Sequence, residues 1–236
     1  MILFENADVL ALDKPPGVSM ATSTKEGKSA ADAVARLFAA CGVPMSNSPP
    51  LLVHRLDAGT SGVVLFAKTP EAHRALSLAL QERRAKKTYR ALVWGHPVPA
   101  KGTIDLALAR DPTDGRKMRA AADGKPSVTR YETLRRYPAL ADLRLSPETG
   151  RTHQIRVHLS TKGHPIAGDD FYGGAGRWHG VRDRRLREAL AGIARPLLHA
   201  ARIEIPEMGI EVAAPLPGDY EEILASLSAA RPAPNR

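Results

Sequence analysis

Several strand-like runs that follow one another without an intervening helix constrain the fold of this chain more than any other feature. Residues 51–56 and 62–68 are separated only by a glycine-containing loop, and residues 127–134 and 141–145 alternate as half-buried strands do. Strands that are consecutive in sequence can pair antiparallel through short turns. The pattern therefore predicts an α+β fold around a mixed, largely antiparallel sheet. The other strand-like runs are residues 9–14, 89–95, 154–159, 198–205 and 210–214.

Three stretches carry helical signals. Residues 28–40 and 181–191 have apolar residues at helical spacing, and the second stretch is strongly basic. Residues 71–84 follow Thr69 and Pro70, which suit the N-cap and the first position of a helix. The apolar positions expected to face the core in the first stretch are Ala31, Val34, Leu37 and Phe38.

The organisation of the chain favours one domain. Its 236 residues contain neither a repeat nor a flexible linker, so we expect a single domain over residues 1–228 and a disordered tail over residues 229–236. Cys41 is the only cysteine, which excludes a disulfide framework and a cysteine-rich zinc module. No apolar run is long enough to span a membrane and no secretory signal is evident, so we expect a cytoplasmic protein.

The net charge points to a polyanionic partner. Lysine and arginine number 34 against 25 acidic residues, which gives a formal charge of +9 and a pI of about 9.9. A charge of this size favours nucleic acid ahead of an anionic membrane. Aromatic residues make up only 5% of the chain, so a long stacking platform for single strands is not expected.

A first polar cluster follows a strand-like run. His54, Arg55 and Asp57 lead into a glycine-containing loop, residues 58–62. Ionisable side chains at the end of a buried strand suit a functional site, because the strand is rigid and the loop leaves room for a substrate. The structural alternative is a turn in which Asp57 accepts backbone N–H bonds.

A second polar cluster occupies residues 149–159. Read as a strand, its two arginines and two histidines need carboxylate or phosphate partners if they are buried. His153 and His158 would point to opposite faces, so a zinc pair is not expected. A surface strand with charged edges is the alternative. The two predicted faces are Arg151, His153 and Ile155 on one side, and Thr152, Gln154, Arg156 and His158 on the other.

A tyrosine stands among cations in a third cluster. Tyr89 is flanked by Lys86, Lys87 and Arg90. Nearby cations favour the phenolate, so Tyr89 could act as an acid or a base, although a strand tyrosine with a solvated hydroxyl is the plainer interpretation. No glycine-rich dinucleotide fingerprint and no metal-ligand spacing occur, so neither a nucleotide cofactor nor a metal is indicated.

Together these stretches resemble one known family. His54-Arg-Leu-Asp57-x-x-Thr60-Ser-Gly62 is similar to the signature of RNA pseudouridine synthases of the RluA family. The resemblance runs from about residue 3 to residue 215. In its length the chain is similar to the short members of the family, which lack an N-terminal S4-type RNA-binding domain. The other matching motifs, in chain order, are Leu12-Asp-Lys-Pro-Pro-Gly17, Lys87-x-Tyr89, Lys125-Pro126, Gly150-Arg-Thr-His-Gln-Ile-Arg-Val-His158, Gly163-His-Pro-Ile-x-Gly-Asp169 and Leu197-Leu-His-Ala200.

The resemblance implies the pseudouridine synthase fold and the isomerisation of uridine in RNA. The glycosidic bond between N1 and C1′ breaks, the uracil turns, and C5 bonds to C1′. This reaction is redox-neutral and needs no cofactor. The implied partner is a stem-loop of ribosomal large-subunit RNA, of tRNA, or of both. We expect a monomer without a membrane or protein partner.

The resemblance also assigns roles to individual residues. Asp57 is the essential carboxylate, acting as a nucleophile, as a stabiliser of an oxocarbenium-like species, or in a glycal route. Tyr89 packs on the base and can move a proton, and Arg156 pairs with the catalytic aspartate. Arg55 fills the space of the flipped nucleotide. The remaining residues expected to contact the substrate are His54, Thr60, Ile155 and Leu198.

Two competing hypotheses belong to other classes. The chain could be an RNA-binding protein that has lost catalysis, which the presence of Asp57, Tyr89 and Arg156 argues against. It could also be a basic enzyme that acts on a small phosphorylated molecule. Activity on RNA but not on free UMP would separate these hypotheses.

Overall fold

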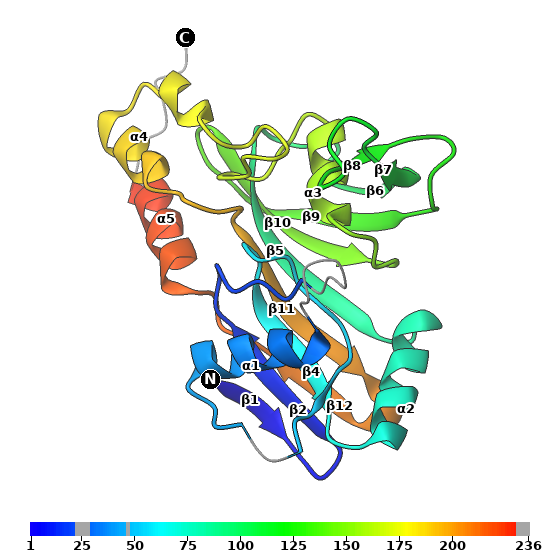
Figure 1. Ribbon diagram of the computed structural model, residues 1–236. Coiled ribbons are helices and arrows are strands. Elements are labelled where there is room, and N and C mark those ends of the chain that lie inside the picture. The colour runs from blue at the N-terminus through cyan, green and yellow to red at the C-terminus, as the bar shows by residue number, and fades with distance from the viewer. Residues whose placement is uncertain (22–28, 46–47, 230–236) are drawn as a thin grey trace. The chain divides into compact units, whose positions relative to one another are not determined.

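The computed structural model describes residues 1–21, 29–45 and 48–229, and Figure 1 shows the chain as a ribbon. The chain forms two compact units. Unit 1 contains Met1–Thr88 and His199–Pro215, and unit 2 contains Tyr89–Leu198 and the described chain from Leu216 onward. A single catalytic domain over residues 1–228 stays a prediction. Most of the predicted tail, residues 230–236, lies outside the described residues.

Unit 1 is built on a mixed, mostly antiparallel sheet. β2 pairs antiparallel with β1 and with β4, and β12 pairs antiparallel with β11. β11 runs parallel to β4, with His199 opposite Ser61. A two-residue strand, β3, also pairs with β4. The bounds of these strands are β1 Ile2–Glu5, β2 Val9–Lys14, β3 Leu51–Leu52, β4 Ser61–Ala67, β11 Leu198–Ile205 and β12 Ile210–Ala213.

The core of unit 1 covers both faces of β4. Val63 and Leu65 pack with Leu76 of α2 (Pro70–Gln81) in one apolar cluster. On the other face, Phe66 meets Phe38 of α1 (Ala30–Cys41) edge to face, with ring centroids 5.5 Å apart. Every residue of β4 is buried as a result. A continuous apolar run is what a strand covered on both faces requires.

Both helices of unit 1 begin at capping residues. Thr69 Oγ1 accepts a hydrogen bond from the Ala72 N–H at 3.1 Å, which confirms the predicted start of α2. α1 begins at Ser29, which forms a reciprocal capping box with Asp32. Its buried residues are Ala33, Val34, Leu37 and Phe38. Ala31 is exposed, so the prediction that Ala31 faces the core was wrong.

Unit 2 contains four antiparallel strands in the order β5-β10-β9-β6, in which β5 pairs with β10 and not with the next strand along the chain, and a separate β7–β8 hairpin. β5 begins in unit 1 and continues into unit 2 from Tyr89. Helices α3, α4 and α5 complete the unit (Figure 1). The bounds are β5 Lys86–Trp94, β6 Lys101–Asp105, β7 Leu108–Arg110, β8 Met118–Ala120, β9 Val128–Arg136, β10 Leu140–Pro147, α3 Gln154–Thr161, α4 Arg184–Ala191 and α5 Gly218–Ala229.

The largest correction concerns residues 154–159, which form helix α3 and not the predicted strand. All six of these residues are buried, including Gln154, Arg156 and His158. Because no position is exposed, the sequence shows no amphipathic period that would separate a helix from a strand. The two predicted side-chain faces are therefore also wrong.

Among the described residues, no group of three or more histidine, cysteine, aspartate and glutamate side chains is placed to hold a metal.

Other differences are smaller. The predicted strand over residues 51–56 is reduced to β3, and the chain from Val53 to Thr60 forms an irregular segment. The predicted helix over residues 181–191 is α4, which begins at Arg184 after the short 3-10 helix Arg177–Gly180. Asp183 caps α4 by accepting the Leu186 N–H at 2.8 Å. No helix in the described part of the chain is long and apolar enough to cross a membrane.

Candidate active site

In unit 1 a buried lysine holds the loop that carries Asp57. Lys14 is 0% exposed at the end of β2. Its Nζ donates to three carbonyl oxygens, of Pro15 at 3.0 Å, Ala58 at 2.9 Å and Thr60 at 2.7 Å. An ammonium carries three N–H donors, so these three bonds match its full capacity. The charge of Lys14 is thereby compensated by carbonyl dipoles, two of which, those of Ala58 and Thr60, lie just after Asp57 in the chain.

Two further backbone bonds close the same loop. The Gly17 N–H donates to the Ala58 carbonyl at 2.8 Å, and the Thr60 N–H donates to the Asp57 carbonyl at 3.0 Å. Gly17 has φ +87°, a left-handed conformation that glycine adopts without strain. Asp57 is half-buried and Thr60 is buried. The backbone from Asp57 to Thr60 is therefore fixed before any substrate arrives.

His54 and Arg55 differ in their surroundings. His54 Nε2 accepts the Leu65 N–H of β4 at 3.1 Å. Burial, and secondly the nearby Lys87 cation, lower the pKa of His54 from 6.5 to about 4. His54 is therefore neutral at pH 7 and attaches the segment before Asp57 to β4. Arg55 is exposed.

In unit 2 the predicted site residue Arg156 forms a buried, two-pronged pair with Asp169. Its Nε and Nη2 donate to the two Asp169 carboxylate oxygens at 2.7 and 2.8 Å. The side chains are 7% and 0% exposed. Asp169 Oδ1 also accepts the N–H groups of Phe171 and Tyr172, at 3.1 and 3.2 Å. A guanidinium carries five N–H donors, of which this pair uses two, so Asp169 fixes the plane in which the others point.

Aromatic side chains enclose this pair. The Arg156 guanidinium carbon lies 5.0 Å from the ring centre of Tyr172 and 5.6 Å from that of Phe171. The Tyr172 hydroxyl accepts the Met118 N–H at 2.9 Å and lies 2.7 Å from His153 Nδ1. His153 begins α3 at φ +53°, an uncommon conformation for a residue other than glycine. The contacts of Tyr172 hold this turn in place.

A buried polar network attaches α3 to β9. Gln154 Oε1 accepts from Thr149 Oγ1 at 2.7 Å, and its Nε2 donates to Thr129 Oγ1 at 3.0 Å. His158 lies one turn later, with Nδ1 at 3.0 Å from the same Thr129 hydroxyl and Nε2 at 3.0 Å from the Leu106 carbonyl. Burial is the main cause that lowers the pKa of His158. Arg156 lies between these two anchors, so its backbone is held at both ends.

Three predicted residues come together in one apolar cluster of unit 2. Ile155 and Leu198 are buried members of this cluster, and the half-buried Tyr89 packs against it. Tyr89 also pairs with Leu145 across β5 and β10, and Leu145 belongs to the same cluster. The aromatic ring therefore adjoins the apolar side chains that were expected to form a pocket wall.

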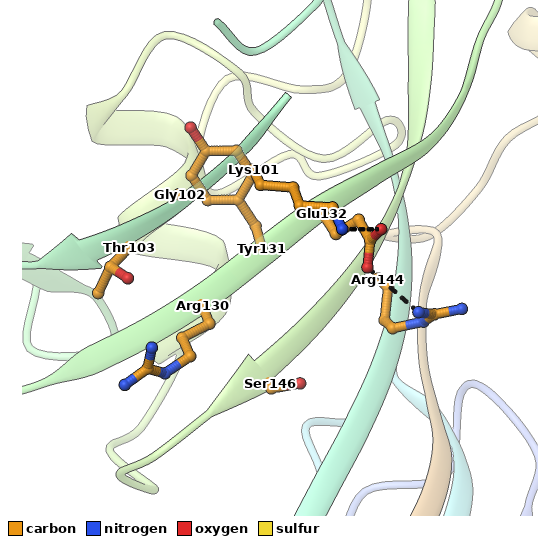
Figure 2. Close-up of a pocket in the computed structure, with 8 residues that line it drawn as sticks. All are labelled: Lys101, Gly102, Thr103, Arg130, Tyr131, Glu132, Arg144 and Ser146. Carbon is orange, nitrogen blue, oxygen red and sulfur yellow. Dashed lines mark hydrogen bonds and ion pairs between the residues drawn. The ribbon is translucent and has the colours of Figure 1, made fainter. Parts of the chain in front are cut away.

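Figure 2 shows a shallow cavity that holds none of the predicted site residues. It is lined by Arg144 and Ser146, which flank Leu145 along β10. Successive side chains of a strand point to opposite faces, so Arg144 and Ser146 point away from the cluster that contains Leu145. Tyr131, which also lines the cavity, packs against that cluster, as Tyr89 does. Glu132 pairs with both Lys101, at 2.8 Å, and Arg144, at 3.2 Å. We call the cations Lys101, Arg130 and Arg144 the sheet-face patch.

Lys14, Asp169 and Tyr172 were not among the site residues predicted from the sequence, and Gln154 was predicted only as part of a strand face. Lys14 offered a signal, because a charged residue at the end of an apolar strand needs a partner when it is buried. Asp169 lay within a matching motif but 13 residues from Arg156, and no local pattern connects the two. Asp57, His54, Arg55 and Thr60 lie in unit 1, and Tyr89, Ile155, Arg156 and Leu198 in unit 2.

Comparison with known proteins identifies the family. Residues 8–161 match the family model described as RNA pseudouridylate synthase. The ribosomal large subunit pseudouridine synthase D of Pseudomonas aeruginosa is 36% identical over 232 residues, which cover 96% of this chain and 71% of that protein. The protein of the same name from Neisseria meningitidis serogroup A is 39% identical over 233 residues, 96% of this chain and 60% of its own length.

Comparison with solved structures points to the same family. Human RNA Pseudouridylate Synthase Domain Containing 1 superposes with a TM-score of 0.70 at 27% identity, covering 99% of this chain and 96% of that one. Human RNA Pseudouridylate Synthase Domain Containing 4 has the same fold, with a TM-score of 0.75 at 24% identity over 98% and 94% of the two chains. On the match of sequence, motifs and α+β fold, the chain belongs to the RNA pseudouridylate synthase family, a family of isomerases.

Proposed function

We propose that this protein converts specific uridines of structured RNA to pseudouridine, with Asp57 as the essential carboxylate. The observation that carries the proposal is the position of Asp57. It lies inside the segment that matches the family model, on a loop that the buried Lys14 fixes through the carbonyls of Ala58 and Thr60. A loop braced in this way suits a group that must meet one atom of a substrate.

The reaction requires few chemical groups besides this carboxylate. The N1–C1′ bond of uridine breaks, the detached uracil turns, and C5 bonds to C1′. C5 then loses its proton and N1 gains one, so atoms and electrons balance without an oxidant or a cofactor. Asp57 meets the electron-deficient C1′, either by attack or by stabilising its positive charge. A route through a glycal would use the same carboxylate as a base.

Tyr89 is proposed to contact the uracil. Its ring is half-buried and lies against the cluster that contains Ile155 and Leu198, which supports a role in holding the base. An aromatic ring and aliphatic side chains suit the flat, weakly polar faces of a detached uracil. The phenol adds a group that can carry a proton between C5 and N1.

Arg156 is proposed to serve the catalytic aspartate as its cation. The support from unit 2 is the rigidity of Arg156: Asp169 fixes its guanidinium, and Gln154 and His158 fix its helix. A cation beside a carboxylate keeps that carboxylate ionised, which the chemistry at C1′ requires. In this proposal Asp169 is a positioning residue, because it acts through Arg156.

The proposed substrate is an RNA stem-loop, in ribosomal large-subunit RNA or tRNA. The relatives from Pseudomonas and Neisseria are named for the ribosomal large subunit, which favours ribosomal RNA as the first substrate to test. A stacked uridine hides C1′ and C5, so the nucleotide must be extruded. The exposed Arg55 is proposed to fill the space that it leaves.

The decisive experiment maps pseudouridine. Ribosomal RNA and tRNA from cells with and without the gene are compared at nucleotide resolution, and purified protein is then incubated with a transcript of each lost site. We expect loss of defined sites in the cell and their restoration by the wild-type protein, with chelator present. If purified protein modifies no RNA, the proposal is wrong. Conversion of free UMP would favour the small-molecule enzyme considered above.

A further inference from the structure

A group of exposed cations surrounds the start of α4. Arg182, Arg184 and Arg185 are exposed, and so are Arg177 and His179 in the preceding turn. We call these five residues the α4 surface. None of them belongs to the groups proposed above for chemistry. They lie within nine successive positions of the chain, residues 177–185, and the only acidic residue among those positions is Asp183.

The fold holds this surface rigidly. Leu186 and Leu190 of α4 are buried in an apolar cluster that also contains Tyr220 and Ile223 of α5, and Figure 1 shows the two helices side by side. The Asp183 carboxylate caps the helix by accepting the Leu186 N–H. Because the apolar side of α4 is buried, the arginines at its start project from a fixed support.

The charges of the α4 surface are poorly neutralised. Arg184 pairs with Glu188 at 2.7 Å, but these side chains are 82% and 61% exposed, and such a pair is worth little. Within the described chain, no carboxylate lies within ion-pair distance of Arg182 or Arg185. The sheet-face patch differs. Lys101 and Arg144 share Glu132, and Arg130 pairs with Glu148 (Figure 2 shows the first two pairs).

An aromatic stack adjoins the arginines. The rings of Trp178 and His179 lie 3.7 Å apart, centre to centre, with an angle of 27° between their planes. Trp178 packs against the apolar cluster beneath α4, while His179 is exposed. An exposed, supported imidazole is a small platform on which a nucleic-acid base can stack.

The α4 surface is continuous with the Arg156–Asp169 pair along the chain. The Asp169 carbonyl accepts the Gly174 N–H at 2.7 Å, and the Gly174 carbonyl accepts from Trp94 Nε1 at 2.7 Å. Arg177 Nε then donates to the Gly173 carbonyl at 2.7 Å. A Cβ on Gly174 would come within 1.7 Å of the Ile166 carbonyl oxygen, so this connection is closely packed.

These observations favour one partner. Guanidinium groups match phosphate oxygens in geometry, and a base-sized aromatic face beside them suits RNA. An anionic membrane would be expected to take up apolar side chains as well, whereas Leu186 and Leu190 are buried. We propose that the α4 surface is a docking site for the phosphate backbone of RNA outside the target nucleotide, with His179 stacking on an unpaired base. This inference rests on the proposed function, because it assigns a second contact to the same RNA substrate.

The test compares two triple variants of the full chain that remove the same charge. One carries Arg182→Ala, Arg184→Ala and Arg185→Ala. The control carries Lys101→Ala, Arg130→Ala and Arg144→Ala in the sheet-face patch. Binding of a fluorescent stem-loop transcript from large-subunit ribosomal RNA is measured by anisotropy at several salt concentrations. Circular dichroism melting shows that each variant is folded.

We expect the α4 variant to bind at least about tenfold more weakly, with a salt slope smaller by about three, since it lacks three arginines and each lost phosphate contact removes about one unit. The control should change the dissociation constant less than about threefold. Arg→Lys at the three α4 positions should restore most of the affinity, because lysine also binds phosphate. His179→Ala should weaken binding without changing the slope.

Equal effects of the two triple variants would show that only net charge matters and would overturn the inference, and so would no effect of either. Tighter binding of the wild type to anionic vesicles than to RNA, lost in the α4 variant, would also overturn it. Isomerisation is measured in parallel. If the wild type binds RNA through the α4 surface but converts no uridine, the proposed function fails while the docking site stands.

Discussion

Lys14 Nζ lies 2.7 Å from the carbonyl oxygen of Thr60, although 46 residues of chain separate the two. This contact connects the end of β2 to the start of β4, across the loop that carries Asp57. The same ammonium holds Ala58. The position of Asp57 thus depends on the buried ammonium of Lys14.

Lys14→Met should therefore destabilise the protein. The substitution keeps the apolar stem but leaves three carbonyls without their donor, and losing such buried partners costs about 3 kcal/mol or more. Urea unfolding of the variant and of Lys68→Met, an exposed lysine paired with Glu5, would measure the difference. A loss for Lys14→Met no larger than that for Lys68→Met would contradict this account of the loop.

Asp57→Asn should abolish isomerisation while RNA still binds. The substitution preserves the shape of the side chain and removes its charge and nucleophilicity. Phosphate contacts supply much of the affinity for RNA, so the dissociation constant should change little. Single-turnover conversion and anisotropy report the two properties separately. Turnover above a few per cent of wild type would show that Asp57 is not the essential carboxylate.

The strands of unit 1 could be predicted because their surroundings are simple. β4 is covered by α1 on one face and α2 on the other, so a continuous apolar run is enough to indicate a buried strand there. Thr69 and Pro70 likewise marked the start of α2, since capping depends on neighbouring residues alone. Local signals of this kind can be read from a sequence without knowing the fold.

Helix α3 could not be predicted from the same kind of signal. Gln154, Arg156 and His158 are buried only because Thr129 and Asp169 supply partners from other elements. The resemblance to a family pointed to Arg156, but nothing near Arg156 in the sequence pointed to Asp169. The motifs thus selected Arg156 as a candidate, whereas its partner Asp169 became evident only in the folded chain.

Arg156→Ala should reduce turnover far more than Arg182→Ala or Arg184→Ala. Removing the guanidinium leaves the fully buried Asp169 without its ionic partner, and breaking a buried pair costs roughly 3–5 kcal/mol. The exposed arginines of the α4 surface should change mainly the KM for RNA. Turnover at saturating RNA, compared among the three folded variants, checks the order. Equal reductions would contradict the role of Arg156.

His54 should make the protein less stable at acid pH. Its pKa is about 4 in the folded protein against 6.5 as the ordinary value, so the unfolded chain binds the proton more readily. The stability that His54 contributes is fully present above about pH 6.5 and is lost as the pH falls toward 4. His158 acts in the same direction.

The measurement for His54 is the free energy of unfolding in urea across this pH range. His54→Gln retains an oxygen that can accept the Leu65 N–H, but it does not titrate. Its unfolding free energy should fall less steeply with acid than that of the wild type. His179→Gln, at an exposed site, serves as the control and should follow the wild type. Parallel curves for His54→Gln and the wild type would refute the assignment.

A uridine in a loop should be modified faster than the same uridine in a continuous duplex. Extruding a base costs a few kcal/mol, and least where the base is already unpaired. The whole chain has only 11 aromatic residues with which to hold open a melted strand: Phe 4, Trp 2 and Tyr 5. The exposed Arg55 and the α4 surface instead suit a short, preformed loop whose phosphates are already displayed.

The test uses one transcript with the mapped uridine in its stem-loop and a second in which a complementary strand pairs the loop completely. Single-turnover rates at saturating protein should be at least about tenfold higher for the stem-loop, which corresponds to about 1.4 kcal/mol of the extrusion cost. If the duplex reacts as fast as the loop, the enzyme must open paired RNA by itself, and capture of a preformed loop is wrong even though the synthase assignment stands.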